Sequence, residues 1–423
     1  MTGRYPAHYG LQNDVIEAAE PNGLPLDETL LSEMLGTYGY HSHVIGKWHL
    51  GHFSWDYTPL NRGFESFYGY YLGDSDYYVH TKSANVDGQT LTGFDLRKDK
   101  DVAREDDGTY STFLFLREAE RVVRNHPEGE PLFLYLPFQN AHAPQQVPEE
   151  FISNTTCKDI PNASRRVYCG MVNALDYAVG EVVELFEAKG MWNNTLLVFT
   201  ADNGGTQSTG GNNAPFRGQK ASYFEGGVRG AGFVYGQALG RGNVDVAGLT
   251  HVTDWFPTIE NFVARAYGGH VHPTKPRLPL DGLDIWDQLT TDKPILNRSV
   301  LLNTDPISMS KALIHGSHKY MIEKNEPYYL VPQANETSAT RPMPDGLETG
   351  LVYKNVKLYE WVFDLDADPL ESDNLALTDA DLLQSLRGIM AGFDAAAVPP
   401  SKKPQTTDAN PTNFGGAWTP WVL

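Results

Sequence analysis

Strand-like and helix-like segments alternate along much of this chain, and each strand candidate is followed directly by polar residues. The strand candidates are 41–45, 132–136 and 196–200. The second is a continuous apolar run, which is typical of a strand covered on both faces of a sheet. Strands that alternate with helices predict an α/β sheet with helices on both faces.

Three helix candidates accompany these strands, at 26–35, 110–124 and 165–189. The third has the clearest pattern, because its apolar residues recur at spacings of 4, 3, 4 and 3, from Met171 to Leu185. This spacing places them on one face of an amphipathic helix. The glycine at position 190 follows as a stop signal.

Polar side chains follow each of the three strand candidates. Lys47 and His49 come after the first, His142 after the second, and Asp202 and Asn203 after the third. Ligands of open α/β sheets collect just beyond the carboxyl ends of the strands. We therefore expect these five side chains to surround one site.

The character of the sequence changes near residue 300. Beyond that point, short strand candidates at 314–322 and 359–363 are separated by a loop rich in Pro, Gly and Thr around 332–350. We predict two domains, an α/β domain over residues 1–300 and a smaller α+β domain over residues 301–423.

Overall composition excludes several classes of function. The 423 residues carry 33 Lys and Arg against 53 Asp and Glu, a net charge of −20. Nucleic acid and anionic membrane surfaces are therefore not expected as partners. The apolar runs stop far short of the ~20 residues that span a bilayer, so no membrane span is expected. Two cysteines exclude a disulfide-held scaffold and a Cys-rich zinc module.

Asp202 and Asn203 are candidate ligands for a cation. A carboxylate beside a carboxamide after a strand, followed by two glycines, presents two hard oxygens. Such oxygens suit Ca²⁺ or Mg²⁺. An ordinary Asx turn that ends a strand is the alternative interpretation.

Two lysines and two histidines are candidate groups for binding an anion. In an extended segment the side chains of Lys47 and His49 point the same way, so an ammonium and an imidazole can converge on one anionic group. His142 lies in a loop whose conformation is restricted by the proline that follows it. Lys220 lies between glycine-rich stretches, where the backbone can approach a ligand closely. The alternatives are a surface lysine, a satisfied histidine and a flexible surface loop.

Together these residues describe a site for a tetrahedral oxyanion ester. Lysines bind the non-bridging oxygens, a metal holds the nucleophile, and a histidine protonates the leaving oxygen. The net charge of −20 strengthens this interpretation, because an anionic substrate needs local positive charge to offset the field of the whole protein.

Two strings carry a family resemblance, Gly-Lys-Trp-His-Leu-Gly at 46–51 and Asp-Asn-Gly-Gly at 202–205. Because it contains both strings, the chain resembles the sulfatase family, specifically the arylsulfatase B (N-acetylgalactosamine-4-sulfatase)-like group. The likeness runs from residue 2 to the C-terminus in preserved order. It includes the further stretches 2–6, 10–12, 39–40, 61–64, 138–148, 192–195, 210–213, 225–230 and 418–421.

The resemblance implies an alkaline-phosphatase-like α/β domain with a small C-terminal domain, and hydrolysis of sulfuric esters. Asp202 and Asn203 match two oxygen ligands of one bound Ca²⁺ in the family pattern. Lys47 and Lys220 match the two lysines that bind the sulfate group.

The resemblance also implies roles for two histidines and an arginine. His49 matches the residue that hydrogen-bonds the nucleophile and helps to eliminate sulfate from it. His142 matches the residue that faces the leaving-group oxygen of the substrate. Both histidines are thus predicted to be catalytic, together with the two lysines. Arg4 matches a supporting residue near the nucleophile.

The nucleophile of the family is expected outside this chain. Family members carry it as Cys-x-Pro-x-Arg, or with Ser in place of Cys, upstream of a Thr-Gly-Arg motif, and a maturation enzyme oxidises it to formylglycine. An Asp-Asp pair further upstream supplies the other metal ligands. Here Thr-Gly-Arg begins at residue 2, so we expect the first 300 residues to lack the N-terminal strand and the nucleophile, and the chain as printed to be inactive. The formylglycine-generating enzyme is a partner only if such a motif precedes Met1.

Cys157 and Cys169 are spaced to suit a local disulfide, with two free thiols as the alternative. They lie among Asn-x-Ser/Thr sequons, which are candidate glycosylation sites. The sequons are at Asn154, Asn162, Asn193, Asn297 and Asn335. Together with the usual location of the family that the chain resembles, the sequons favour a secretory, lysosomal or extracellular location.

The residues allow three functions. The first is a sulfatase that acts on a sulfated carbohydrate or an aryl sulfate ester. The second is a non-catalytic pseudoenzyme that binds sulfated glycans. The third is a phosphate-ester hydrolase of the same superfamily, which the lysine and histidine pattern fits less well, because those enzymes hold two zinc ions with extra Asp and His ligands.

Overall fold

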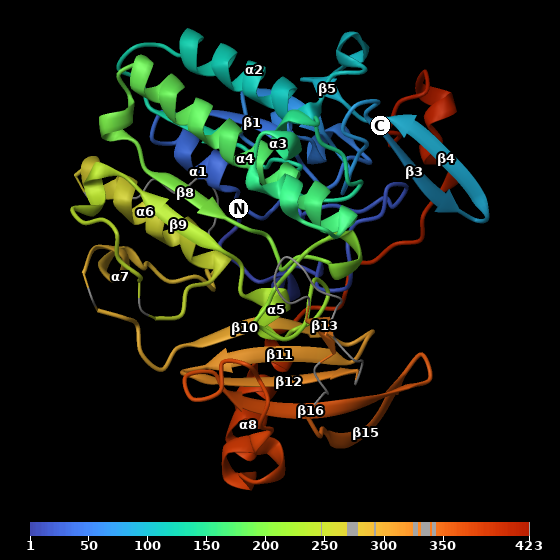
Figure 1. The fold of residues 1–423 in the computed structure, drawn as a ribbon, viewed down its shortest axis with the longest axis vertical. Coiled ribbons are helices and arrows are strands. Elements are labelled where there is room, and N and C mark those ends of the chain that lie inside the picture. The colour runs from blue at the N-terminus through green and yellow to red at the C-terminus, as the bar shows by residue number, and fades with distance from the viewer. Residues whose placement is uncertain are drawn as a thin grey trace.

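The computed structural model describes residues 1–246, 248–268, 278–291, 293–324 and 344–422, and the short strands β13 (Tyr329–Leu330) and β14 (Ala339–Thr340). Figure 1 shows one sheet flanked by helices in the upper part of the molecule and an antiparallel sheet in the lower part. Within the described residues, no helix has the length and apolar character needed to cross a membrane.

The upper sheet has five strands in the order β6-β5-β2-β1-β7. Their bounds are β1 His41–Lys47, β2 Ser66–Tyr70, β5 Arg97–Lys98, β6 Asp101–Val102 and β7 Leu132–Tyr135. β1 has parallel partners on both sides, β2 and β7, whereas β5 and β6 join antiparallel. The strands predicted over 41–45 and 132–136 are therefore confirmed as β1 and β7.

Two glycines let β1 approach its neighbours closely. A Cβ on Gly46 would lie 2.2 Å from the carbonyl oxygen of Pro137, and a Cβ on Gly69 would lie 1.9 Å from that of Gly46. The same approach lets the Lys47 N–H donate to the Pro137 carbonyl at 2.9 Å. The end of β1 is thus fixed beside the segment that leads from β7 to His142.

Helices cover both faces of the upper sheet, as predicted. α2 (Ser111–Asn125) and α4 (Ala163–Ala188) pack on one face around Ile45. α1 (Leu31–Gly36) and α6 (Trp255–Ala266) lie on the other face and pack with Phe133. These helices and the sheet confirm the expected layered α/β arrangement.

Two of the three predicted helices have nearly the expected bounds, and the third is shorter. α2 and α4 match the candidates at 110–124 and 165–189, but α1 begins only at Leu31. The Glu33 carboxylate accepts the Leu30 N–H at 2.8 Å and caps the helix at that point. The helix predicted from residue 26 is therefore wrong in its first half.

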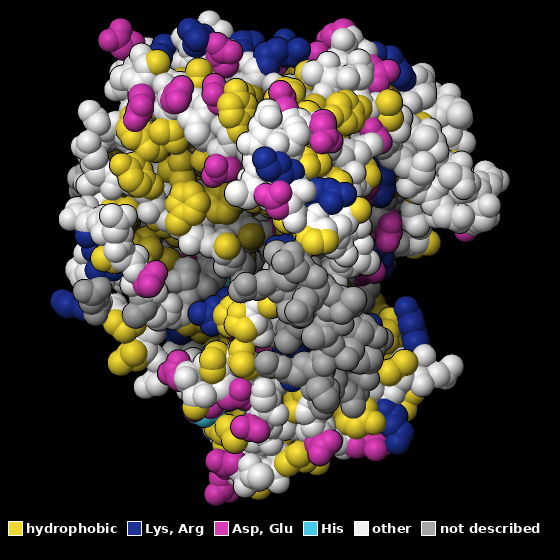
Figure 2. Space-filling model, viewed as in Figure 1, with side chains coloured by type: hydrophobic (Ala, Val, Ile, Leu, Met, Phe, Trp, Pro, Cys, Tyr) yellow, Lys and Arg dark blue, Asp and Glu magenta, His cyan; other side chains and the backbone are white. Residues whose placement is uncertain are grey.

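The third strand candidate forms part of a separate ribbon. β8 (Leu197–Thr200) pairs with β9 (Gly232–Tyr235) in an antiparallel two-stranded sheet. β7 pairs with β1 alone among the described strands, and its side chains are half-buried. β7 lies at the edge of its sheet but is covered on both faces, since Leu132 and Leu134 pack with α2 and α4, whereas Phe133 packs with α1 and α6. The prediction for residues 132–136 is therefore confirmed. Figure 2 shows apolar side chains gathered on this face over β8 and β9.

The lower sheet is fully antiparallel, with strand order β10-β11-β12-β16-β15. The helix α8 (Ala380–Ala396) packs against it. The bounds of the strands are β10 Ser299–Asp305, β11 Ser310–His315, β12 His318–Lys324, β15 Leu347–Tyr353 and β16 Val356–Asp364. The candidate at 359–363 lies in β16. The single strand predicted over 314–322 was wrong, because Gly316, with φ of +59°, turns the chain between β11 and β12.

The last residues of the chain return to the upper part of the molecule. Trp418 is fully buried there and its N–H donates to the Phe94 carbonyl at 3.0 Å. In the opposite direction, Tyr5 and Ala7 pack into the core of the lower sheet. The domain boundary near residue 300 stays a prediction, and the two parts exchange segments at both ends of the chain.

The remaining elements are short. A hairpin of β3 and β4 lies beside the C-terminal segment. The bounds are β3 Thr81–Val86, β4 Gln89–Phe94, α3 Glu150–Ser153, α5 Glu225–Val228 and α7 Trp286–Thr290.

Candidate active site

Lys220 and His142 contact each other directly. The Lys220 Nζ lies 3.0 Å from His142 Nε2, and His142 Nδ1 lies 2.8 Å from the Ala143 carbonyl oxygen. A carbonyl oxygen can only accept, so Nδ1 carries the ring proton and Nε2 accepts from the ammonium. Burial lowers the pKa of His142, and the positive charges of Lys220 and Lys47 lower it further. The imidazole is therefore neutral in this arrangement.

Tyr77 fixes the loop that carries His142. This side chain is fully buried, and its hydroxyl lies 2.9 Å from the carbonyl oxygens of Gln139 and His142. Gln139 in turn donates from Nε2 to the Ser75 carbonyl and accepts from the Ser111 hydroxyl at 3.1 Å. The loop is thus tied both to α2 and to the segment that follows β2.

Lys47 ends β1, and His49 lies two residues beyond it. His49 has φ of +52°, so the chain leaves the extended conformation and the expectation of two parallel side chains does not hold there. The His49 Nε2 donates to the Ile16 carbonyl oxygen at 3.0 Å. Burial and, to a smaller extent, the positive charge of Lys47 lower the pKa of His49 to about 4. His49 is therefore a neutral imidazole with Nδ1 as its acceptor.

Asp202 and Asn203 lie on the loop that follows β8. This loop crosses the start of α5 so closely that a Cβ on Gly204 would lie 1.7 Å from the Gly226 carbonyl oxygen. Glycine is required at this crossing, and the Gly204 N–H donates to the backbone of Gly227 at 2.9 Å. The close approach brings the Asp-Asn pair to the loop that carries Lys220.

Asn213 joins the same two loops through its side chain. Its Oδ1 accepts from the Gly205 N–H at 2.8 Å, and its Nδ2 donates to the Gly218 carbonyl at 3.2 Å. One carboxamide therefore holds the Asp-Asn-Gly-Gly string against the segment just before Lys220.

The electrostatics place Lys47 beside both loops. Burial lowers the pKa of the Lys47 ammonium, Asp202 opposes this effect, and Lys220 adds to it. The charges of Lys220 and Asp202 thus act on Lys47, and the charge of Lys47 acts on both predicted histidines.

Arg4 lies apart from this group. Its Nη1 forms an ion pair with Glu28, and its Nε donates to the Pro279 carbonyl at 3.0 Å. Burial raises the pKa of Glu28, and the Arg4 charge opposes that rise. Within the described residues, Arg4 therefore ties the start of the chain to the segments around residues 28 and 279.

The side-chain oxygens of Asp202 and Asn203 are of the type that Ca²⁺ binds, but they are fewer than a Ca²⁺ site needs. Asp202 is exposed, and Asn203 donates from Nδ2 to the Gly204 carbonyl at 2.9 Å, which leaves its Oδ1 as an acceptor. Ca²⁺ takes about six to eight oxygen ligands. Across the described ranges, no group of three or more His, Cys, Asp or Glu side chains is arranged to hold a metal ion. Two oxygen donors do not make a complete site.

Asp74 and Lys82 are charged neighbours of the site that the sequence reasoning missed. The Lys82 Nζ lies 2.6 and 2.7 Å from the two carboxylate oxygens of Asp74. The charge of Asp74 acts on Lys47, although burial is the larger influence on the pKa of that lysine. Asp74 follows β2, so the rule that ligands gather beyond strand ends would have found it had residues 66–70 been identified as a strand.

Cys157 and Cys169 form a disulfide, with their Cα atoms 5.6 Å apart. The bridge joins the segment after α3 to the first half of α4. Asn173 also donates to the Cys157 sulfur at 3.0 Å. Both cysteines of the chain are therefore engaged with each other.

Four of the five sequon asparagines have exposed side chains. Asn162 caps α4 by accepting the Arg165 N–H at 3.0 Å, and Asn193 accepts from Gln237 at 2.9 Å. The fifth, Asn335, lies outside the described residues. The exposed four are Asn154, Asn162, Asn193 and Asn297.

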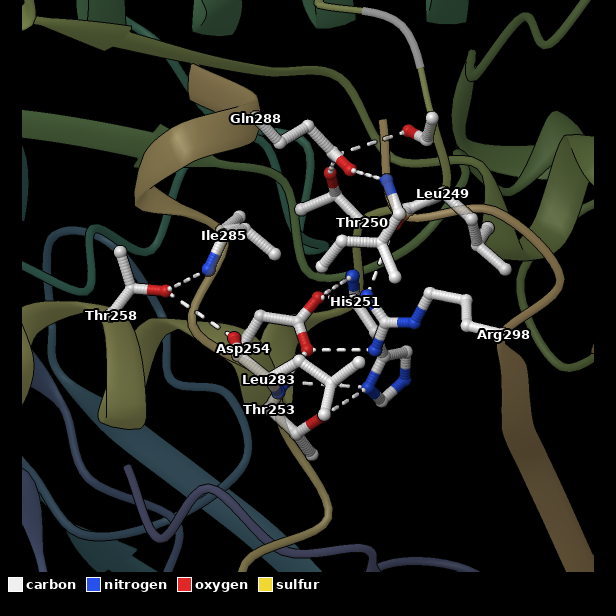
Figure 3. A network of polar contacts seen from close by, with 12 residues as sticks. Leu249, Thr250, His251, Thr253, Asp254, Thr258, Leu283, Ile285, Gln288 and Arg298 are labelled. Carbon is white, nitrogen blue, oxygen red and sulfur yellow. Dashed lines mark hydrogen bonds and ion pairs between the residues drawn. The ribbon is translucent and has the colours of Figure 1, made fainter. Parts of the chain in front are cut away.

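A second polar network lies away from the loops of the site. Figure 3 shows Arg298 and Asp254 in a two-pronged ion pair, with both contacts at 2.8 Å. The side chains are 4% and 0% exposed. Asp254 also accepts the backbone N–H groups of His251 and Leu283 at 2.7 and 2.9 Å. This network fixes the start of α6 to the chain that enters β10.

Comparison with known proteins gives one family. Residues 1–261 match the family model described as Sulfatase. Arylsulfatase J of Mus musculus is 32% identical over 441 residues, covering 100% of this chain and 71% of that protein. N-acetylgalactosamine-6-sulfatase of Rattus norvegicus is 30% identical over 54% of this chain and 45% of that protein. Arylsulfatase A of Bos taurus is 27% identical over 96% of this chain and 80% of its own length.

Solved structures share the fold. Ps i-CgsB in complex with k-i-k-neocarrahexaose has a TM-score of 0.76 at 24% identity, covering 98% of this chain and 85% of that one. The PsFucS1 sulfatase from Pseudoalteromonas sp. has a TM-score of 0.66 at 22% identity, covering 95% and 80%. The predicted fold class is confirmed, an alkaline-phosphatase-like α/β fold with a C-terminal antiparallel sheet.

Proposed function

Because the chain belongs to the sulfatase family, hydrolases that act on sulfate esters, we propose that its site binds a sulfated sugar and supports removal of the sulfate. The names of relatives support a sugar, since several are N-acetylgalactosamine-6-sulfatases. A further neighbour, with a TM-score of 0.58 at 14% identity, is described in complex with its substrate D-Glucosamine-2-N,6-O-disulfate. The arylsulfatase B-like group, with N-acetylgalactosamine 4-sulfate as substrate, is the narrower form of this proposal, and aryl sulfate esters fit the same site.

The contact between Lys220 and His142, with Lys47 nearby, carries the proposal. A sulfate ester has one negative charge spread over three non-bridging oxygens, and two ammonium groups complement that charge. In the free site the Lys220 ammonium donates to the His142 imidazole at 3.0 Å. A bound sulfate gives this ammonium a stronger acceptor and leaves His142 Nε2 available.

Sulfate binding prepares His142 for proton transfer. The negative charge of the ester counters the two lysines that help to lower the pKa of His142, so the imidazole gains a proton more easily. A proton on Nε2 is then in place for the leaving oxygen of the sugar. Nδ1 keeps its bond to the Ala143 carbonyl and holds the ring in place.

Asp202 and Asn203 supply two oxygen ligands of a Ca²⁺ ion in this proposal. When bound there, such an ion would stabilise negative charge on the sulfate oxygens. His49, whose Nε2 is held by the Ile16 carbonyl, would offer Nδ1 to the formylglycine nucleophile that the family resemblance implies, which forms the new bond to sulfur as the bond from sulfur to the sugar oxygen breaks.

Binding without hydrolysis is the second candidate function. It is favoured by the cysteines, since both are joined in the disulfide. The motif Cys- or Ser-x-Pro-x-Arg does not occur in the 423 residues. In this candidate the lysines hold a sulfated glycan and no sulfate is released.

The test combines binding with sulfate release. Calorimetry with an N-acetylgalactosamine 4-sulfate oligosaccharide and its desulfated form measures whether the sulfate carries affinity. Lys220→Met should weaken binding about 10- to 100-fold, the range for a charged hydrogen bond. Lys311→Met is the matched control, because this lysine pairs with Asp394 at 2.6 Å on the lower sheet.

Two outcomes separate the candidates. Release of inorganic sulfate, measured by ion chromatography, supports the hydrolase, and binding without release supports the glycan-binding protein. Equal affinity for the sulfated and desulfated sugars contradicts both. The same assay with a phosphorylated sugar tests the phosphate-ester alternative.

We also propose a cellular location for the protein. Exposed sequons and a disulfide suit the secretory pathway, a lysosome or the extracellular space. A formylglycine-generating enzyme is a partner if a nucleophile motif precedes Met1.

A further inference from the structure

The loop that carries Lys220 is folded on itself. The Gly226 N–H donates to the Arg217 carbonyl at 2.6 Å and closes the base of the loop. The Ser222 N–H and hydroxyl donate to the Gln219 carbonyl at 3.0 and 2.9 Å, which forms a tight turn around Lys220. The position of the Lys220 ammonium therefore depends on where the base of this loop is held.

A buried ionic cluster from the lower sheet holds that base. Lys319, on β12, lies 2.7 Å from Glu225 Oε1 and 2.7 Å from Glu371 Oε1. The side chains of Lys319 and Glu371 have no exposed surface, and that of Glu225 is 6% exposed. Glu225 is the first residue of α5, immediately beside the closed base.

Glu371 accepts hydrogen bonds from both ends of the base of the Lys220 loop. Its Oε2 accepts the Glu225 N–H at 2.8 Å, and its backbone carbonyl accepts from Arg217 Nε at 3.2 Å. Two buried carboxylates this close repel each other unless a cation lies between them. Lys319 contacts both carboxylates and holds Glu225 and Glu371 together, whereas Arg229 lies 3.4 Å from Glu225 on its exposed side.

Other contacts keep the loop on the lower sheet independently of Lys319. The Tyr223 N–H donates to Glu323 Oε2 at 3.2 Å. Phe224 is fully buried and packs with Trp361 and Phe363. These contacts would persist in a Lys319 variant, so such a variant should keep the loop docked while releasing its base.

We propose that Lys319 is a positioning residue of the sulfate-binding site, which fixes the Lys220 loop from the lower sheet so that the Lys220 ammonium meets His142. The role in ligand binding rests on the proposed function. The role in holding Lys220 against His142 does not, because that contact exists without a ligand. The lower sheet thereby takes part in a site whose other residues follow strands of the upper part.

The test replaces Lys319 and follows His142. Lys319→Met removes the cation, and Glu371→Gln removes one carboxylate charge with little change in shape. Arg298→Met is the matched control, because Arg298 and Asp254 form an equally buried ion pair near α6. Lys220→Met gives the reference for a site without the ammonium. The readouts are the pKa of His142, from NMR titration of labelled histidine, and the affinity for the sulfated oligosaccharide.

We expect Lys319→Met and Glu371→Gln to raise the pKa of His142 toward that of Lys220→Met, since Lys220 helps to lower it. Affinity for the sulfated oligosaccharide should fall at least about tenfold, as for loss of one charged hydrogen bond. In the double variant Lys319→Met/Lys220→Met, the pKa of His142 should be no higher than in Lys220→Met alone. Arg298→Met should lower the unfolding midpoint and leave both readouts unchanged.

A folded Lys319→Met protein with the wild-type pKa of His142 overturns the proposal. If that variant does not accumulate in folded form, Glu371→Gln decides by the same criterion. If the wild type binds no sulfated sugar, the proposed function fails, whereas the titration of His142 still decides the role of Lys319.

Discussion

The ammonium of Lys220 lies 3.0 Å from Nε2 of His142, although the two residues are 78 positions apart in the chain. An ammonium can only donate, so the contact requires an imidazole without a proton on Nε2. The protonation of His142 therefore depends on whether an anion is bound between the two loops. A bound anion attracts the Lys220 ammonium away from Nε2 and favours the protonated imidazole.

Replacing Lys220 by Met should raise the pKa of His142. The ammonium is one of the causes that lower this pKa, after burial, so its removal makes protonation easier. NMR titration of labelled histidine measures the change. Lys311→Met should leave the titration as in the wild type, and an unchanged or lower pKa in Lys220→Met would contradict the contact.

Replacing Tyr77 by Phe should destabilise the loop that carries His142. The change removes the hydroxyl donor of the His142 carbonyl, whereas the Gln139 carbonyl keeps the His142 N–H, at a cost of about 1–3 kcal/mol in the free energy of unfolding. Urea unfolding measures this cost. Tyr235→Phe is the control, because that tyrosine is 56% exposed, and equal stabilities of the two variants would refute the role of the hydroxyl.

Stability should fall with acid because His52 is buried in its neutral form. Burial and, to a smaller extent, the positive charge of Arg97 lower the pKa of His52 from 6.5 to about 3. Between these pH values the unfolded chain binds a proton that the folded chain does not. The contribution of His52 is thus intact above pH 6.5 and declines by about 1.4 kcal/mol per pH unit as the pH falls toward 3.

The variant His52→Phe tests this dependence. It keeps an aromatic ring beside Tyr71, which stacks with His52 at 5.7 Å between ring centres. Urea unfolding at pH 7.5, 6 and 5 should show a shallower decline for the variant than for the wild type. Parallel declines would mean that His52 does not titrate in this range.

Removing the disulfide should destabilise the protein moderately. Cys157 and Cys169 are 12 residues apart, and a loop of this size contributes about 2–4 kcal/mol by restricting the unfolded chain. The double variant Cys157→Ser/Cys169→Ser should therefore unfold at lower urea concentration. The wild type with a reducing agent should lose the same stability, and the double variant should not respond to the reductant.

Asp202 should govern the response to Ca²⁺. Its exposed carboxylate is the strongest oxygen donor at the loop after β8. Because these two donors make only part of a site, a rise in the unfolding midpoint of the wild type should require a large excess of Ca²⁺, and Asp202→Ala should abolish most of that rise. Asp366→Ala, at another exposed aspartate, serves as the control. An equal rise in all three proteins would place the ion elsewhere.

Local patterns predicted the elements that position the site. β7 and α4 could be predicted because an apolar run and a regular 3–4 spacing reflect burial of one segment against a layer. The polar residues after β1, β7 and β8 could be predicted for the same reason, since strand ends define where they lie. The extended geometry assumed for His49 failed because its positive φ is set by contacts with neighbouring segments.

Long-range pairing could not be predicted. Lys319 and Glu371 look like ordinary surface residues in the sequence, and only the folded chain places them together without exposed surface. The hairpin at Gly316 was missed because only two residues, Gly316 and Ser317, separate the two strands. The position of β8 in its own ribbon depends on its pairing with β9, which carries no local signal.

The return of the C-terminal segment sets the order in which this protein can mature. Arg97 is fully buried and donates to the Trp418 carbonyl at 2.6 Å across 321 residues of sequence. The upper sheet therefore cannot reach its final packing while the ribosome still holds Trp418. We expect the completing step to follow the emergence of Trp418 from the ribosome, with apolar surface exposed until then. A nonsense mutation just before Trp418 would thus leave the upper sheet in an incompletely packed form that chaperones retain.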